Sequence, residues 1–474
     1  MRLLLLLLAC AAAAVAPSSA REPLQSIDDF VATELPRSGA PGLVYAIVED
    51  GEIQAAARGA IATGAGVAGT ADTPFLLGSI SKSFTALAVM QFVEGGEVAL
   101  DAGIATYLPA FADRPSGAIT VRQLLSHTSG FSTRQGNYTH IDLTDGEDEL
   151  ARHVDRIAQW NPANEPGLKW EYSNANYQVL GALIETVSGR DFASYVEAEI
   201  LAPIGMADSF VADGARHETM ALAHRPWFGA KRAMQESATH RVIAPAGGVI
   251  ASAADVARYL AVMMNGEDDV LSAQSKAAMM RPASALSPLY GFGWFVDAET
   301  QAVFHTGVSP GMDTLAVLRP AEQRGVVVLV NAGGGFGFGE TNNLLSGIGA
   351  RAFGLDPPQS GPGWSRKALF VMFALLPAFF SLSLIWVSLH REGLRAKSGL
   401  AGGFSLWFPL AATLALAWVV VDLIPRLFGV SIITLQRFQP DLVLVMLVGA
   451  VTGVVLASAR IAIAYSGKAP LRQS

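Results

Sequence analysis

A serine and a lysine lie three positions apart in the segment Ser79-Ile80-Ser81-Lys82, which opens an apolar helical pattern. Side chains at positions i and i+3 share one face of a helix, so the lysine amine can lie beside the serine hydroxyl. The amine can take the hydroxyl proton if burial or a neighbouring cation lowers its pKa. Ser79 and Lys82 are therefore candidates for a nucleophile and its base, although a solvated lysine at a helix start is the commoner arrangement.

A second motif, Tyr172-Ser173-Asn174, is the only Tyr-x-Asn in the chain. It lies in a predicted loop before a helical pattern that begins at Tyr177. A phenol close to a lysine can shuttle a proton, and an amide can hold a substrate carbonyl. The structural alternative is a tyrosine buried for its area and an asparagine that fixes a turn.

A third motif, His305-Thr306-Gly307, ends a strand-like run. The small Gly307 would let a substrate backbone lie close to the strand, Thr306 offers a hydroxyl, and His305 offers a charge or a hydrogen bond. The structural alternative is an ordinary strand end followed by a turn glycine. The motif therefore gains its meaning only together with the other two.

The patterns around these motifs indicate how they are positioned. Residues 42–60 read as a β-hairpin. Far along the chain there are four more strand-like runs, at 291–296, 302–305, 314–318 and 325–331. The sequence between these groups is mostly helical, with helical spacing over 83–93, 177–187 and 253–264. This order predicts an α+β fold in which both ends of the domain contribute strands to one sheet.

The three motifs, in this order, resemble those of the penicillin-recognising serine hydrolases. This superfamily includes the serine β-lactamases, the low-molecular-weight penicillin-binding proteins and related esterases and D-amino peptidases. The resemblance is closest to the class C β-lactamase-like branch with its D-Ala-D-Ala carboxypeptidases, and it covers roughly residues 25–355. Further segments that look like this branch are Thr73-Pro74-Phe75, Leu124 to Gly130, Tyr172 to Gly181, Gly247-Gly248 and Tyr290 to Trp294. The resemblance implies a β-lactamase/transpeptidase-like antiparallel sheet with flanking helices and a helical middle.

The resemblance also implies a two-step acyl transfer. Ser79 would attack a carbonyl and form an acyl-enzyme, while Lys82 and Tyr172 move the protons. The backbone N–H groups of Ser79 and Val308 would form the oxyanion hole. The remaining substrate-binding positions that it implies are Asn174, His305, Thr306 and Gly307.

Two residues need a separate interpretation. His305 stands where most β-lactamases have lysine, and a histidine is mostly neutral at pH 7, which puts efficient penicillin hydrolysis in doubt. The substrate therefore stays open between a D-peptide, an ester and a β-lactam. His127, in the family-like segment that ends at Gly130, is interpreted as a ring that braces a loop near the site. The alternative to an enzyme is a penicillin-binding-protein-like sensor or scaffold with little turnover.

Charge and cysteine content exclude other classes of function. The whole chain carries −8, the part from Lys367 onward +6 and the first 20 residues +1, so residues 21–366 carry −15. A domain this acidic has no electrostatic footprint for nucleic acid. The only cysteine, Cys10, leaves no internal disulfide and no thiol nucleophile. The histidines lack zinc-binding spacing. We expect neither a metal nor another cofactor.

The two ends of the chain indicate export and membrane insertion. Residues 1–20 read as a secretory signal peptide, with lipoprotein processing at Cys10 left open. The predicted hydrolase domain is 21–357, followed by a linker at 358–367 and a membrane region at 368–474. Its three apolar segments, 368–389, 404–424 and 442–459, are each long enough, or nearly so, to cross a bilayer of about 30 Å. We expect an inner-membrane protein with a periplasmic catalytic domain, a cytoplasmic C-terminus, and the bilayer and a carbonyl substrate as its partners.

Overall fold

The computed structural model describes residues 21–143, 146–215, 217–234, 239–357 and 363–466. The predicted signal peptide and the first half of the predicted linker lie outside these residues. The chain divides into two compact units, residues 1–361 and residues 362–474. After the domains that the sequence predicts, we call them the catalytic unit and the membrane unit.

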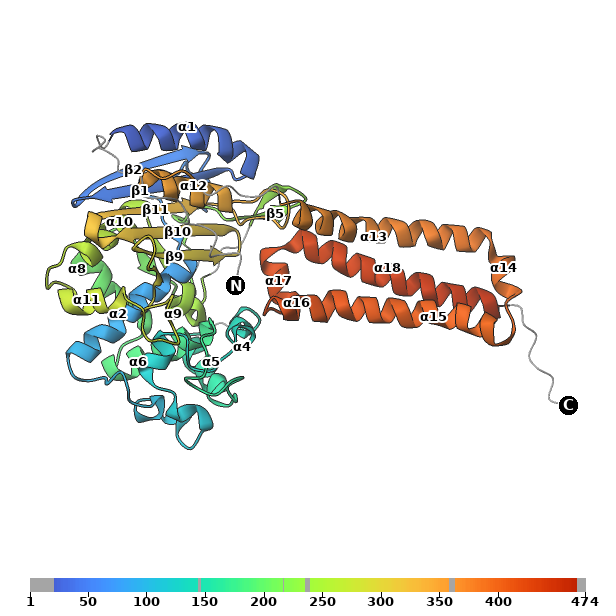
Figure 1. Cartoon of the computed structure of the whole chain (residues 1–474), viewed down its shortest axis with the longest axis horizontal. Coiled ribbons are helices and arrows are strands. Elements are labelled where there is room, and N and C mark those ends of the chain that lie inside the picture. Colours follow the sequence, from blue (N-terminus) through green and yellow to red (C-terminus); the bar gives the residue numbers. More distant parts are fainter. Residues whose placement is uncertain (1–20, 144–145, 216, 235–238, 358–362, 467–474) are drawn as a thin grey trace. The chain divides into compact units, whose positions relative to one another are not determined.

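A six-stranded antiparallel sheet forms the centre of the described catalytic unit, in the order β2-β1-β11-β10-β9-β8 (Figure 1). Strand β1 is buried over nearly its whole length and pairs with β11 in a register that sets Leu43 opposite Val330. The prediction that both ends of the domain build one sheet is confirmed. The strands are β1 (Gly42–Glu49), β2 (Glu52–Gly59), β8 (Phe295–Asp297), β9 (Ala302–Ser309), β10 (Met312–Arg319) and β11 (Arg324–Val330).

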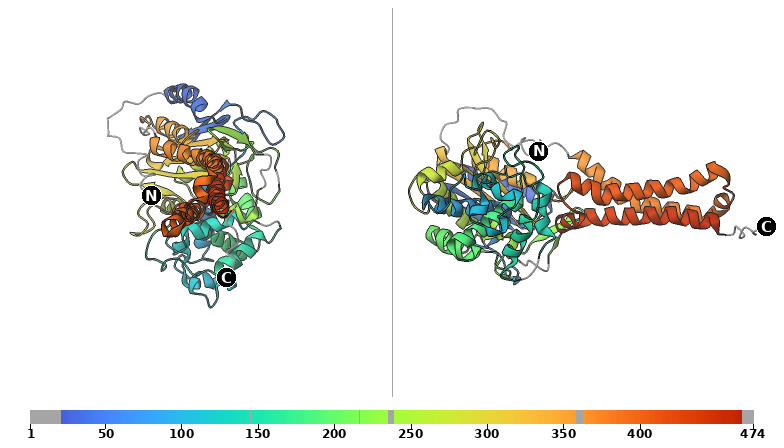
Figure 2. Two further views of the ribbon diagram at one scale, coloured as in Figure 1. Left: turned by 90° about the vertical axis from the view of Figure 1, so that its right-hand side faces the viewer. Right: turned by 90° about the horizontal axis from the view of Figure 1, so that it is seen from below.

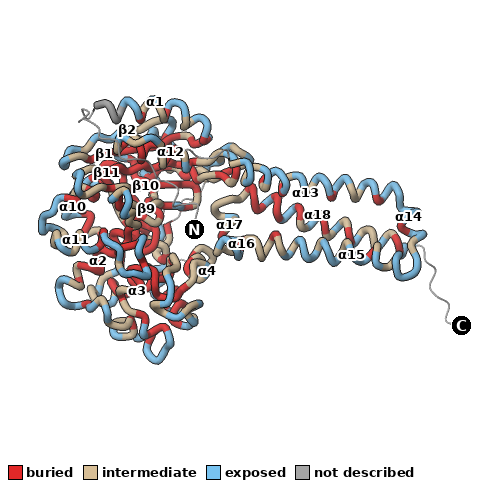
Figure 3. The backbone as a smooth tube through the Cα atoms, in the orientation of Figure 1, coloured by how far each residue is buried: buried red, intermediate tan, exposed pale blue. Residues whose placement is uncertain are grey.

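Helices cover both faces of this sheet, as Figures 1 and 3 show. On one face, α1 (Arg21–Ser38) and α12 (Asn342–Ala352) pack together over apolar side chains of β1 and β11. On the other face, α10 (Ala253–Met264) contacts the same two strands. The sequence predicted the bounds of α10. Its N-terminus is capped by Ser252, whose side chain accepts a hydrogen bond from the N–H of Asp255.

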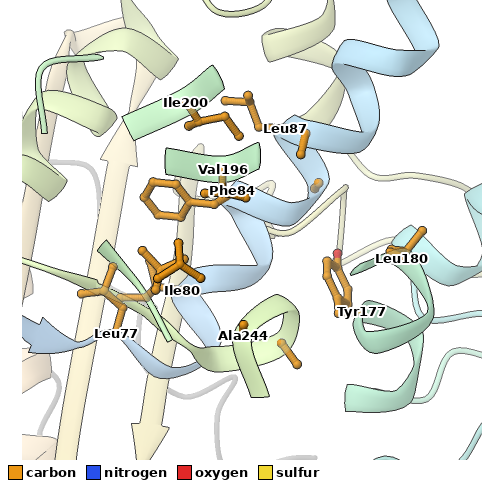
Figure 4. Close-up of a cluster of buried hydrophobic side chains, with 14 of the residues drawn as sticks. Leu77, Ile80, Phe84, Leu87, Tyr177, Leu180, Val196, Ile200 and Ala244 are labelled. Atoms are coloured by element: carbon orange, nitrogen blue, oxygen red, sulfur yellow. The ribbon is translucent and has the colours of Figure 1, made fainter. Parts of the chain in front are cut away.

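The helical middle encloses α2 (Ser81–Glu94), in which every residue from Ser81 to Met90 is buried. Apolar side chains from several elements surround this helix, among them Phe84, Leu180 and Val196 (Figure 4). The start of α2, with Lys82, is thus fully enclosed. The other helices here are α3 (Val121–Leu125), α4 (Thr133–Gly136), α5 (Glu149–Ala158), α6 (Asn174–Ser188), α7 (Phe192–Val196), α8 (Ala202–Ile204), α9 (Ala244–Gly247) and α11 (Ala273–Met279).

Short strands complete the catalytic unit. One small sheet has the order β3-β7-β4, and β5 pairs with β6 in a hairpin. The small sheet that contains β7 adjoins the segment that leads into α2, because the N–H of Leu77 donates to the carbonyl of Val249. These strands are β3 (Phe75–Leu76), β4 (Phe210–Val211), β5 (His224–Trp227), β6 (Ala230–Ala233) and β7 (Val249–Ala251).

The membrane unit contains, within its described residues, three helices long and apolar enough to cross a membrane. They are α13 (Trp364–Leu389), the continuous helical stretch from α15 through α16 (Gly399–Leu427) and α18 (Pro440–Tyr465). Both views in Figure 2 show them side by side, and α18 packs against α13 and α15. The components of the second stretch and the connecting helices are α14 (Arg391–Arg395), α15 (Gly399–Trp418), the π-helical turn η10 (Val419–Leu423), α16 (Ile424–Leu427) and α17 (Ile432–Phe438).

These helices extend beyond the predicted apolar segments. The first begins at Trp364 rather than at residue 368, so the last residues of the predicted linker are helical. The second covers 399–427 and the third 440–465, instead of 404–424 and 442–459. The reason is physical: hydropathy marks the apolar stretch, whereas backbone hydrogen bonding continues through the polar residues that flank it.

Candidate active site

Ser79 lies in a short 3₁₀ turn, η2 (Gly78–Ile80), immediately before α2. The Nζ of Lys82 lies 3.1 Å from the Oγ of Ser79. The sequence predicted this proximity from the i, i+3 spacing, and the continuous turn of η2 and α2 provides it. The serine side of the pair is partly exposed, whereas Lys82 is fully buried.

Two carbonyl oxygens hold the amine of Lys82 in place. Its Nζ donates to Asn174 Oδ1 at 2.8 Å and to the backbone carbonyl of Ala246 at 2.6 Å. The Nδ2 of Asn174 donates in turn to Asn137 Oδ1, at 3.2 Å, which fixes the amide orientation. Burial lowers the pKa of Lys82 well below its ordinary value of 10.5. The structure therefore favours a neutral amine beside the Ser79 hydroxyl.

Tyr172 faces the same amine. The Lys82 Nζ lies 5.0 Å from the centroid of the Tyr172 ring. Burial raises the pKa of the Tyr172 phenol, and the nearby Ser79 hydroxyl opposes this rise only in part. Its hydroxyl oxygen is buried and has no hydrogen-bond partner among the described residues. A phenol in this environment stays protonated, so it is suited to donate a proton rather than to act as a tyrosinate base.

Strand β9 lies against the Ser79 turn. An added Cβ at Gly307 would meet the carbonyl oxygen of Leu77 at 1.9 Å, so only glycine allows this approach. The carbonyl of Leu77 also accepts a hydrogen bond from Thr314 Oγ1, at 2.7 Å. A Cβ at Gly78 would lie 2.9 Å from the backbone nitrogen of Val308. The two backbone positions predicted for the oxyanion hole, Ser79 and Val308, thus lie on segments in direct contact.

The third motif divides between the two faces of β9, because side chains alternate along a strand. His305 is only 1% exposed, while Val308 is 58% exposed and Thr306 is partly buried. Both ring nitrogens of His305 are engaged: Nδ1 lies 2.7 Å from the carbonyl of Thr306, and Nε2 lies 3.2 Å from the Tyr290 hydroxyl. Burial lowers the pKa of His305 to about 3. The ring is therefore a buried, neutral group.

Sequence reasoning missed three contributors to this geometry. Ala246 acts through its backbone carbonyl, and Asn137 acts by orienting Asn174. Neither has a sequence signal of its own. Tyr290 lies in a segment that resembles the family, but its contact with His305 follows only from the fold. Within the described residues, no group of three or more His, Cys, Asp or Glu side chains could hold a metal ion.

The comparisons with known proteins agree with this geometry. The sequence model of the family described as "Beta-lactamase" matches residues 25–349. The chain is 32% identical to "Penicillin-binding protein 4" of Amycolatopsis lactamdurans over 317 residues, which cover 62% of this chain and 81% of that protein. It is 24% identical to "Protein flp" of Staphylococcus aureus over 316 residues, 65% of this chain but only 62% of that protein.

Solved structures share the fold. The octameric penicillin-binding protein homologue from Pyrococcus abyssi has a TM-score of 0.61 at 24% identity, covering 73% of this chain and 81% of its own. D-alanine carboxypeptidase AmpC from Burkholderia cenocepacia has a TM-score of 0.57 at 24% identity, covering 71% of this chain and 99% of its own.

The family match covers well over half of the chain and includes all three motifs. The match to the Amycolatopsis protein exceeds 30% identity and covers most of that relative. The resemblance inferred from Ser79-x-x-Lys82, Tyr172-x-Asn174 and His305-Thr306-Gly307 is thereby confirmed, and the chain belongs to the beta-lactamase family of serine hydrolases.

Proposed function

We propose that this protein is a membrane-anchored serine hydrolase that forms an acyl-enzyme on Ser79. The single observation that supports this most strongly is the 3.1 Å contact between Ser79 Oγ and the fully buried Lys82 Nζ. A neutral amine has two N–H groups, and the carbonyl oxygens of Asn174 and Ala246 accept both. Its lone pair is then left for the hydroxyl proton of Ser79.

The reaction has two steps. In the first, the Ser79 oxygen bonds to the substrate carbonyl carbon as its proton passes to Lys82, with the oxyanion at the N–H groups of Ser79 and Val308. Tyr172 gives its proton to the leaving group as the bond to that group breaks, and it regains a proton from Lys82. In the second step, water replaces the serine oxygen at the carbonyl carbon. The products are a carboxylic acid and the protonated leaving group.

The geometry of the third motif bears on the substrate. A buried His305 that is neutral and engaged at both nitrogens offers no permanent positive charge to a substrate carboxylate. Thr306 and Asn174 offer neutral polar contacts. These features favour amide or ester substrates over penicillins. Similar folds occur in a D-amino acid amidase from Ochrobactrum anthropi and in the hydrolase EstCE1, which fits this range.

The location follows from the helices of the membrane unit. Three apolar helices provide more than enough length to anchor the protein in a bilayer. Together with the signal-like residues 1–20, they support a catalytic unit on the periplasmic side of an inner membrane.

The experiment uses purified full-length protein in detergent. It is mixed in turn with a D-alanyl-D-alanine peptide, a D-amino acid amide, a p-nitrophenyl ester and a penicillin, and turnover and intact mass are followed. We expect turnover of an amide or ester, and loss of at least about 1,000-fold in Ser79→Ala. Ser346→Ala is the matched control, because Ser346 lies on α12, which covers the face of the sheet opposite to α10.

The outcomes separate the candidates. An adduct on wild type that is absent from Ser79→Ala supports the nucleophile. Undiminished turnover in Ser79→Ala contradicts the proposal. Binding of these compounds without turnover or adduct would favour the sensor or scaffold instead.

A further inference from the structure

His127 contacts the Tyr172 segment on both sides of the tyrosine. Its backbone carbonyl accepts the N–H of Glu171 at 2.9 Å, and its Nδ1 accepts the N–H of Ser173 at 3.2 Å. Its ring centroid lies 4.3 Å from that of Tyr172. His127 was expected to brace a loop near the site. These contacts show which loop it holds, namely the segment that contains Tyr172, the proposed proton donor.

The hydrogen bonds define the tautomer of His127. Its Nδ1 also accepts from Asn176 Nδ2, at 2.9 Å, and the Oδ1 of Asn176 accepts from Ser129 Oγ, at 2.6 Å. An Nδ1 that accepts from two donors has no proton, so the proton is on Nε2. Nε2 is buried and has no partner among the described residues. Burial lowers the pKa of His127 well below 6.5, so the acceptor persists at neutral pH.

The backbone of His127 is strained. Its φ is +58°, a region that residues with a Cβ seldom adopt and that asparagine tolerates better. The side chain is also completely buried. Such strain persists only when surrounding contacts determine it, and here those contacts are the bonds to Ser173 and Asn176.

We propose that His127 is a positioning residue that fixes Tyr172 for proton transfer through the Ser173 N–H bond to Nδ1. This inference rests on the proposed function of Tyr172. It goes beyond a bracing role, because it assigns the effect to one ring nitrogen and to one step of the reaction.

Two substitutions isolate that nitrogen. In His127→Asn, the Oδ1 can occupy nearly the place of Nδ1, and asparagine tolerates the positive φ. In His127→Gln, the amide lies one carbon further out, near the place of Nε2, so the acceptor at Nδ1 is lost. Both replacements are neutral, polar and small enough for the buried site, so they serve as matched controls for each other.

The experiment measures two quantities on full-length protein in detergent. Hydrogen exchange at the Ser173 amide reports the bond itself, and single-turnover acylation of Ser79 by the substrate that wild type turns over reports its consequence. We expect His127→Gln to lose protection at Ser173 and to acylate 10- to 100-fold more slowly, with a little-changed substrate KM. We expect His127→Asn to stay within about threefold of wild type in both measurements.

Several results would overturn the proposal. One is loss of protection at Ser173 in His127→Gln with an unchanged acylation rate. Another is an equal loss in both variants that matches their lower folded fraction, which indicates a merely structural role. If His127→Gln does not fold, Asn176→Ala provides the second test. This variant removes one donor to His127 Nδ1 and spares the bond from the Ser173 N–H. Slow acylation with full protection of the Ser173 amide would then contradict the proposal. Absence of any acylation in wild type contradicts the proposed function instead, and exchange at Ser173 alone then decides whether His127 holds this segment.

Discussion

In the catalytic unit, Lys82, His127 and His305 are at most 1% exposed, whereas in the membrane unit Phe379 and Leu382 are more than 60% exposed. The first unit encloses ionisable groups in an apolar interior and thereby shifts their pKa values. The second presents large apolar side chains outward, which suits a lipid environment. Under the proposed function, burial serves the chemistry of one unit, whereas exposure serves the anchoring of the other.

The two units also differ in the kind of group that lies against a closely packed glycine. In the catalytic unit, Gly307 lies against a backbone carbonyl, that of Leu77. In the membrane unit, Gly453 lies against the ring of Phe380, which an added Cβ would meet at 3.0 Å. A backbone carbonyl within a sheet and turn cannot move without disturbing its neighbours, but a ring can rotate. Four predictions test these contrasts, beginning with the largest expected effect.

Gly307→Ala should have the largest effect. The new methyl group would overlap the Leu77 carbonyl and separate β9 from the Ser79 turn, which we expect to abolish measurable acylation and to destabilise the catalytic unit by about 3 kcal/mol. Acylation kinetics measure the first effect. Denaturant unfolding, followed by proteolysis of the catalytic unit, measures the second. Gly403→Ala, where nothing lies within 4 Å of the new methyl group, is the control. Near-normal acylation in Gly307→Ala would show that the contact is softer than described.

Leu375→Arg should impair the membrane unit alone. Leu375 is 60% exposed near the middle of α13, where an arginine costs about 2.5–3.5 kcal/mol for membrane insertion. We expect a smaller membrane-integrated fraction in an alkaline-extraction assay. Val67→Arg, at an equally exposed position of the catalytic unit, should leave that fraction unchanged. Equal behaviour of the two variants would remove the contrast between the two surfaces.

The stability of the catalytic unit should fall in acid. The pKa of His305 is about 3 in the folded state and about 6.5 when unfolded, so unfolding takes up a proton between these pH values. Stability from this group is fully present above pH 6.5 and falls by about 1.4 kcal/mol per pH unit below it. Denaturant unfolding from pH 7.5 to 5 measures this slope, to which the neutral His127 adds in the same direction. In His305→Asn, the slope of the unfolding free energy against pH should correspond to one proton fewer taken up on unfolding. An unchanged slope would refute the buried neutral state of His305.

Gly453→Ala should have the smallest effect. Rotation of the Phe380 ring can accommodate the methyl group, and alanine favours the helix, so we expect a change of about 1 kcal/mol or less in the stability of the helix bundle. Steric-trap or thermal unfolding of the full-length protein in lipid measures it. Gly453→Leu, which no ring rotation can accommodate, should be clearly worse. A severe loss in Gly453→Ala would mean that this helix contact is as rigid as that at Gly307.

Much of the fold followed from the sequence, because local signals and periodicity agreed. The hairpin at 42–60 and the helix over 253–264 show clear turn and capping residues. Helix α1 was missed, because its first residues follow the signal-like segment and its pattern is weakly apolar. The sequence also gave no reason to place the His305 ring inside the sheet. Its burial depends on Tyr290 and on the register of β9, which are properties of the folded chain.

The candidate site could be predicted as a set of side chains but not as a network. The spacing of Ser79 and Lys82 predicted their contact, and order along the chain linked them to Tyr172 and Asn174. The amine's second acceptor is the carbonyl of Ala246, and no residue type specifies a backbone carbonyl. The same holds for the N–H of Ser173 that His127 accepts.

The pairing of β1 with β11 has a consequence for the order of events during synthesis. The interior edge of β1 stays open until the ribosome has made residues 324–330, almost 300 positions after β1 itself. The first candidate membrane span begins soon afterwards, at Trp364. Until then the growing chain has an unpaired, strongly apolar strand edge, which is prone to aggregate. The sheet can therefore be completed only once residues 324–330 are made, shortly before synthesis of the first candidate span begins, and a chaperone that shields β1 would act until then.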